Sequence, residues 1–243
     1  MKSSISRRIA AEFFGTAFLV AAVVGSGIMG ERLSNGNVAI ALLANTVATG
    51  AALVALILTF GPISGAHFNP AVSLADAMEG GLTWLQGSGY VVAQIAGGLT
   101  GTVGANLMFG LRTISISQHV RSGSSQMLSE FVATFGLLCV IWGCSRTRSN
   151  VVAFAVGAYI TAAYWFTAST SFANPAVTMA RTLSNTFAGI RPADVPLFVL
   201  AQLFGALAAT LLFRWLAPGL IRPKNVVIAH ESEAALATET VSR

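Results

Sequence analysis

Two stretches of the chain are near copies of each other: Ser64-Gly-Ala-His-Phe-Asn-Pro-Ala-Val-Ser-Leu-Ala-Asp76 and Ser171-Phe-Ala-Asn-Pro-Ala-Val-Thr-Met-Ala-Arg181. Aligned on Asn69 and Asn174, both read Asn-Pro-Ala-Val, then a hydroxyl residue, Leu or Met, and Ala. An Asn ahead of a helix and a Pro in its first turn are strong signals for a helix start. Each stretch therefore predicts a short helix, one begun by Asn69-Pro70-Ala71 and the other by Asn174-Pro175-Ala176.

The remainder of the chain is apolar enough for a lipid environment. It is 54% hydrophobic and 9% charged, whereas a soluble domain is roughly 25% charged. Apolar stretches of about 20 residues, the length that a bilayer requires, cover residues 9–30, 38–60, 84–109, 127–144, 151–168 and 195–217. Two further apolar pieces, 69–78 and 174–183, are about half as long. We therefore predict six full membrane spans and two half-spans.

The similarity between the halves extends beyond the Asn-Pro-Ala boxes. Ala11-Glu12-Phe13-Phe14-Gly15-Thr16 resembles Ser129-Glu130-Phe131-Val132-Ala133-Thr134, and Ala93-Gln94-Ile95-Ala96-Gly97 resembles Ala201-Gln202-Leu203-Phe204-Gly205. Each repeat, about 5–115 and 126–220, then contains three full spans and one half-span. Because three is an odd number, the second repeat must be inverted relative to the first. The two half-helices should enter from opposite sides, with their N-termini meeting near the membrane midplane.

The distribution of positive charge predicts the orientation. Lys2, Arg7 and Arg8 precede the first span, Arg146 and Arg148 lie in a short connection, and Arg214, Arg222 and Lys224 lie at or after the last span. These flanks share one side, which the positive-inside rule assigns to the cytoplasm. Both termini should therefore be cytoplasmic. The first span could alternatively be a signal peptide, but Glu12 within it and its length favour a membrane helix.

The repeated boxes, the Glu in the first span of each repeat and the Ser-Gly-Ala-His-Phe-Asn-Pro-Ala run together resemble the major intrinsic protein family, the aquaporins and aquaglyceroporins. The resemblance covers about residues 5–220. It implies an all-α membrane protein with six tilted transmembrane helices and two re-entrant half-helices in an inverted repeat. It also implies one pore per subunit, a homotetramer in the bacterial inner membrane, and neither cofactor nor metal. We expect one transmembrane channel domain over residues 1–224 and a disordered cytoplasmic tail over 225–243.

The resemblance assigns roles to the polar residues within the spans. The side-chain amides of Asn69 and Asn174 would donate hydrogen bonds to the solute at the pore centre, rather than act only as helix caps. His67 would lie on the cytoplasmic pore wall, although packing alone could explain it. Glu12 and Glu130 would accept hydrogen bonds from the irregular backbone leading into the half-helices. Proton coupling is the alternative role for these two carboxylates.

One position departs from the family pattern. Most members carry Arg directly after the second Asn-Pro-Ala, where this chain has Val177. By resemblance, the outer constriction would be formed by Thr49, Ala162, Ser171 and Val177, a set without an aromatic or charged side chain. Such a ring should be wide and mildly apolar, with two hydroxyls. Arg181, one helical turn further along, could either carry charge at the outer mouth or extend to the lipid interface.

Val177, together with Asn185-Thr-Phe-Ala-Gly-Ile190, resembles bacterial aquaglyceroporins that are associated with arsenic-resistance operons. The implied function is passive conduction of arsenous acid, glycerol-like polyols and water. A general water and glycerol channel and a proton-coupled transporter are the alternatives. An intramembrane enzyme is disfavoured because His67, His119 and His230 are dispersed. Nucleic-acid binding is disfavoured because the basic residues are scattered rather than clustered.

Overall fold

A computed structural model describes residues 3–217, and all of the regular structure in this part is helical. Six helices within it are long and apolar enough to cross a membrane, which confirms the six predicted spans. They are α1 (Ile5–Leu33), α2 (Val38–Ser64), α4 (Trp84–Met108), α5 (Ser124–Thr147), α6 (Val152–Phe166) and α8 (Val195–Leu216). The 3-10 turns are η1 (Ser149–Val151), η2 (Arg181–Leu183) and η3 (Pro192–Asp194). The predicted tail, residues 225–243, lies outside the described residues.

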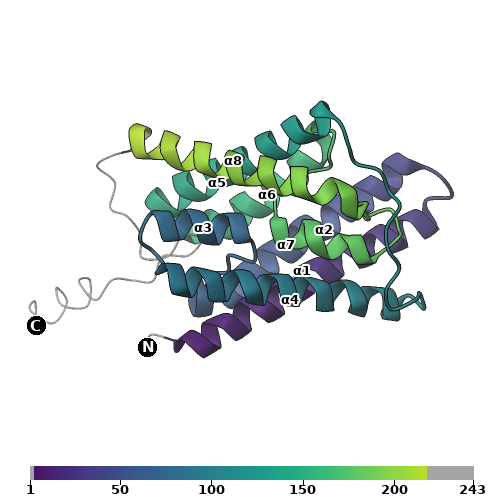
Figure 1. Ribbon diagram of the computed structural model, residues 1–243, viewed down its shortest axis with the longest axis horizontal. Coiled ribbons are helices and arrows are strands. Elements are labelled where there is room, and N and C mark those ends of the chain that lie inside the picture. The colour runs from purple at the N-terminus through teal and green to yellow at the C-terminus, as the bar shows by residue number, and fades with distance from the viewer. Residues whose placement is uncertain (1–2, 218–243) are drawn as a thin grey trace, which may run out of the picture.

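The two half-spans form short helices, α3 (Pro70–Met78) and α7 (Pro175–Ala180). Both lie inside the bundle, where α3 packs against α4 and α8, and α7 packs against the same two helices (Figure 1). In each repeat the first helix packs against the second and the last, so that α1 contacts α2 and α4, and α5 contacts α6 and α8. The repeats meet where α2 packs against α6, and where each half-helix packs against the last long helix of the other repeat, α3 against α8 and α7 against α4.

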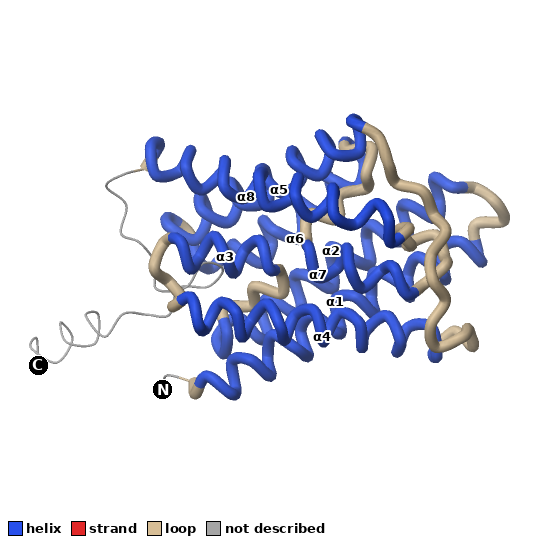
Figure 2. The backbone as a smooth tube through the Cα atoms, viewed as in Figure 1, coloured by secondary structure: helices blue, strands red, loops and turns tan. Residues whose placement is uncertain are grey.

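The half-helices point to opposite ends of the bundle. We call the end that contains Ile5, Thr147 and Leu216 the terminal side, and the end formed by residues 34–37, 109–123 and 181–194 the loop side. Glu79 caps α3 at the terminal side, where its carboxylate accepts hydrogen bonds from Arg214 Nε at 2.6 Å and Arg146 Nη2 at 3.2 Å. The loop after α4 runs across the other end of the bundle (Figure 2), and Ser117 N there donates to the Thr182 carbonyl just beyond α7 at 2.8 Å.

Large apolar side chains cover the outside of the bundle. Phe18, Val92, Phe204 and Trp215 are between 60% and 76% exposed, and they come from both repeats. An outer face of this kind is unsuited to water but is what lipid tails require. The chain is therefore a multi-pass membrane protein.

Glycines allow α1 and α4 to approach closely, because a Cβ atom would overlap the neighbouring backbone. A Cβ at Gly97 would overlap the Phe13 carbonyl oxygen, and one at Gly101 would overlap that of Ala17. The inverted repeat has the equivalent contact, where a Cβ at Gly205 would meet the Phe131 backbone in α5. Small residues at four-residue spacing are the usual means by which membrane helices approach to backbone distance. These contacts hold the bundle together away from its centre.

We expect Gly101→Ala to destabilise the protein, since the added methyl group must push α1 and α4 apart, at a cost of roughly 1–3 kcal/mol. The matched control is Gly104→Ala on the same helix, where a Cβ meets nothing within 4 Å. That variant should be neutral or stabilised by up to about 1 kcal/mol, because Ala favours a helix over Gly. Thermal unfolding in detergent measures the difference. Equal melting temperatures for the two variants would contradict the close approach.

Candidate functional site

The two asparagines of the repeated boxes connect the half-helices at the centre of the bundle. Asn69 Oδ1 accepts from Ala71 N at 2.9 Å, and Asn174 Oδ1 accepts from Ala176 N at 3.0 Å, so each caps its own helix. Asn69 Nδ2 donates to the Ala173 carbonyl at 2.8 Å, and Asn174 Nδ2 donates to the Phe68 carbonyl at 2.7 Å. Each side chain thus bonds the residue that precedes the other asparagine. A carboxamide has two N–H donors, so each amide keeps one further donor.

The backbone leading to each asparagine adopts the same unusual conformation. Three residues before it, Ala66 and Ser171 have φ of 49° and 47°, and one residue before it, Phe68 and Ala173 have φ of 50° and 48°. Non-glycine residues in the left-handed region are strained by roughly 1–2 kcal/mol each. Such residues persist only where the surroundings hold them in place. The two segments therefore need partners for their backbone amides inside the bundle.

Glu12 and Glu130 are those partners. The Glu12 carboxylate accepts from His67 N at 3.0 Å and Phe68 N at 2.7 Å, and also from Ser64 Oγ and Gln94 Nε2. The Glu130 carboxylate accepts from Phe172 N and Ala173 N, both at 2.9 Å, and from Gln202 Nε2. Both carboxylates are completely buried. Buried carboxylates that accept several hydrogen bonds are anchored structural groups. Neither Glu12 nor Glu130 lines the cavity that lies between the two repeats.

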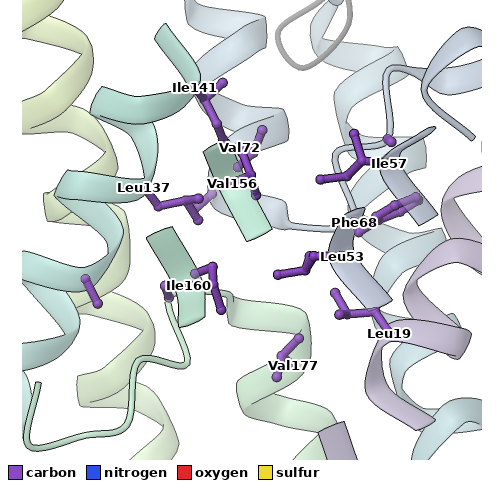
Figure 3. Close-up of a cluster of buried hydrophobic side chains, with 14 of the residues drawn as sticks. Leu19, Leu53, Ile57, Phe68, Val72, Leu137, Ile141, Val156, Ile160 and Val177 are labelled. Carbon is purple, nitrogen blue, oxygen red and sulfur yellow. The ribbon is translucent and has the colours of Figure 1, made fainter. Parts of the chain in front are cut away.

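A narrow cavity of about 60 Å³ runs between the two repeats, and both asparagines line it. Roughly 10–15 Å³ of such space holds one water molecule, so the cavity suits a short row of waters or one small polyol. Its wall is mostly apolar: Leu19, Leu53, Ile57, Val72, Leu137, Ile141, Val156, Ile160 and Val177 contribute to it. Figure 3 shows these side chains surrounding the centre from elements of both repeats.

His67 lines the terminal-side part of this cavity and is 5% exposed. Its Nδ1 lies 3.0 Å from Ser73 Oγ, and its ring packs edge-on against Tyr90 with the centroids 5.3 Å apart. Its Nε2 is buried, has no hydrogen-bond partner among the described residues, and lies 3.8 Å from Asp76 Oδ2. The imidazole is therefore fixed in place by one nitrogen and the ring face.

Three of the four residues expected at the constriction lie in the cavity wall, and one does not. Thr49, Ser171 and Val177 line the cavity, whereas Ala162 is exposed on the outside of α6. Residues four apart share one face of a helix, and residues two apart lie about 200° away from each other. Val156, Ile160 and Tyr164 form the inner face of α6, so Ala162 must face away from them.

Tyr164 stands where the expected ring placed Ala162. It is 3% exposed, and its hydroxyl donates to Thr49 Oγ1 at 3.3 Å. The cavity wall therefore contains an aromatic side chain, which the expected set lacked. The signal available in the sequence was the spacing of Val156, Ile160 and Tyr164, which marks one face of the span.

Two buried arginines lie at the loop side. Arg181 is 1% exposed and lines the cavity, which excludes an extended position at the lipid interface. Arg121 is 7% exposed and bonds loop carbonyls, among them Gly189 O at 2.8 Å and Ser169 O at 3.1 Å. Burial lowers the pKa of Arg121 to about 10, because desolvation disfavours its charged form, yet the group stays charged at neutral pH. Sequence reasoning did not single out Arg121, since one Arg in a long loop carries no pattern.

Comparison with known proteins agrees with this geometry. The model of the family described as major intrinsic protein matches residues 1–153 and 143–242. The chain is 54% identical to the aquaglyceroporin AqpS of Rhizobium meliloti (strain 1021) over 94% of this chain and 96% of that protein. It is 30% identical to the rice aquaporin NIP1-4 over 86% of this chain and 76% of that protein.

The fold is also found in a solved structure. The aquaglyceroporin from Plasmodium falciparum superposes with a TM-score of 0.70, covering 88% of this chain and 98% of that one at 20% identity. At that identity the likeness concerns the fold alone. The family model, the close bacterial relative and the paired Asn-Pro-Ala half-helices lead to one conclusion: the chain belongs to the major intrinsic protein family.

Proposed function

We propose that the protein is a passive channel for small neutral hydroxylated solutes, arsenous acid and glycerol-like polyols together with water. We further propose that it works as a homotetramer in the bacterial inner membrane, with the terminal side in the cytoplasm. The 54% identical relative is named an aquaglyceroporin, and this name supports glycerol-like polyols as solutes of the proposed channel. The observation that carries the proposal is the shared cavity with two asparagine amides at its middle.

The chemistry of the cavity wall suits a neutral permeant. Among the described residues the wall contains no carboxylate, and most of its surface is apolar. A neutral solute can enter such a space if a few polar atoms replace its hydration. The second N–H of Asn69 and of Asn174 would supply two such donors at the centre.

A further polar atom lies at the same wall. Ser171 Oγ is buried without a hydrogen-bond partner among the described residues, and Ser171 lines the cavity. A buried polar atom left without a partner costs about 1–3 kcal/mol, so this hydroxyl needs water or a solute. A trihydroxide such as arsenous acid offers both donors and acceptors. We therefore propose Thr49, Ser171 and Val177 as lining residues of the constriction, with Tyr164 in place of Ala162.

Passive transport is the first expected outcome. Proteoliposomes should show water, glycerol and arsenous acid permeabilities above those of empty liposomes by stopped-flow light scattering, and a protonophore should leave all three unchanged. The reason is that Glu12 and Glu130 are occupied by backbone amides and do not reach the cavity. Solute accumulation that stops when the proton gradient is collapsed would establish a coupled transporter instead. Water conduction alone would remove the polyol assignment.

Restoring the common family residue should narrow the pore. Val177→Arg adds a long cationic side chain to the cavity wall. The permeability to the larger solute, arsenous acid, should therefore fall more than the permeability to water. We expect the ratio of arsenous acid to water permeability to fall about tenfold, which corresponds to roughly 1.4 kcal/mol in a barrier. Val177→Leu is the control for bulk without charge and should have a smaller effect. A ratio that is unchanged or higher in Val177→Arg would show that Val177 does not limit solute size.

The central amides should be needed for selectivity. Asn174→Asp replaces the donor that bonds the Phe68 carbonyl by a carboxylate oxygen, which removes a solute donor and adds negative charge. We expect neutral-solute flux to fall and a cation leak to appear. Asn185→Asp, at an exposed position on the loop side, is the control for the same charge change away from the cavity. If Asn174→Asp keeps the permeabilities of the unmodified protein, the asparagine acts only as a helix cap.

A further inference from the structure

Arg181 is a buried cation without an acidic partner. Its side chain is 1% exposed, and no ion pair to it is found among residues 3–217. Its Nε donates to the Ala188 carbonyl, while Nη1 is buried and has no hydrogen-bond partner in the described part of the chain. A buried charge without a counterion is costly, so this position calls for a role beyond packing.

The helix geometry brings the guanidinium back toward Val177. Residues four apart lie on one face of a helix, and helical side chains lean toward the N-terminus of their own helix. Arg181 follows Val177 by four residues, and both line the same cavity. The long side chain therefore extends over the turn that contains Val177. Val177 is the position at which most family members carry Arg.

An aromatic ring fixes the guanidinium in this position. The Arg181 Cζ lies 3.4 Å from the centroid of the Phe172 ring, and Phe172 also lines the cavity. A guanidinium stacked on an aromatic face is stabilised by the ring quadrupole and is held in one plane. With Nε bonded to Ala188 and the plane set by Phe172, the guanidinium is held in one position while its Nη1 stays unbonded among the described residues.

The second buried arginine serves as a comparison. Arg121 also contacts the Phe172 ring, at 4.9 Å, but its nitrogens are bonded to loop carbonyls, including those of Gly189 and Ser169. Arg121 is absent from the cavity wall. Its role is to hold the loops of the loop side together, whereas Arg181 has an unbonded donor and a place in the wall.

We propose that Arg181 supplies the fixed positive charge of the loop-side constriction, from one helical turn beyond the usual position of the family arginine. This inference rests on the proposed channel function. It replaces the expectation of an uncharged ring: the constriction combines an apolar Val177 with a displaced cation. The solutes that it favours are neutral and hydroxylated, because the guanidinium can donate to a solute oxygen while its charge repels sodium and hydronium ions.

The expected effect on ions is large. Two unit charges about 4–6 Å apart, at an effective dielectric constant of about 20, repel strongly enough to change a passage rate by more than one order of magnitude. Removing the charge should therefore raise cation leakage at least tenfold. The flux of neutral solutes does not meet this electrostatic barrier and should change far less.

Three substitutions and one control test the proposal in proteoliposomes. Arg181→Met keeps the unbranched stem without charge. Arg181→Gln keeps an amide that can bond the Ala188 carbonyl, so that the charge is tested even where Arg181→Met does not fold. Arg181→Lys keeps the charge without the planar fork. Arg112→Gln removes a positive charge from an exposed loop-side position. Sodium and proton leak are measured with fluorescent indicators at equal protein density, and glycerol and water permeability on the same vesicles.

The proposal expects at least tenfold more cation leak in the folded neutral variants, and the leak of the unmodified protein in Arg181→Lys and Arg112→Gln. The proposal is overturned by a neutral variant that folds, conducts glycerol and shows no more cation leak than the unmodified protein. It is also overturned by a cation leak in Arg181→Lys equal to that in Arg181→Gln. Failure of the proposed function is seen separately, as an unmodified protein that does not conduct glycerol. If Arg181→Met and Arg181→Gln both fail to fold while Arg181→Lys folds but leaks, the charge is not the barrier and the proposal also falls.

Discussion

The structure depends on how irregular backbone is satisfied at the centre of an apolar bundle. The segments before Asn69 and Asn174 contain left-handed residues and cannot bond their own amides as a helix does. No lipid or bulk water can serve them there. Glu12 and Glu130 accept these amides, and the two asparagines donate to the carbonyls of the opposite segment. These bonds link the two repeats at the centre of the bundle, where both half-helices begin.

The same bonds explain why the cavity wall is so poor in polar groups. The Glu12 and Glu130 carboxylates accept backbone amides outside the cavity wall. One N–H of each asparagine amide donates to a carbonyl of the opposite repeat. What reaches the cavity is a small number of donors and acceptors spaced along an apolar tube. Gly97, Gly101 and Gly205 keep the pairs α1–α4 and α5–α8 tightly packed, while the cavity lies between the two repeats.

Which residues line the cavity at the loop side depends on helical phase as well as on position along the chain. On α6 a shift of two residues exchanges a cavity-lining Tyr164 for a surface Ala162. Arg181 follows Val177 by four residues, about one helical turn along α7 and η2. The Arg181 side chain can therefore cover Val177. Counting from the boxes misses Tyr164, and it leaves the place of Arg181 open between the outer mouth and the lipid interface. It therefore underestimates how aromatic and how basic this end of the cavity is.

The sequence alone determined the six spans, the two half-helices, their inverted relation and the family. Each of these follows from signals in the sequence: the length of the apolar stretches, the Asn-Pro helix starts and the matching segments of the two repeats. It also indicated that Glu12 and Glu130 belong with the irregular segments, because they recur at matching places in the two repeats. The tertiary structure decided which residues line the cavity. Tyr164, Arg121 and Arg181 owe their places to helix rotation and to loop carbonyls from distant segments, and no local pattern encodes contacts of that range.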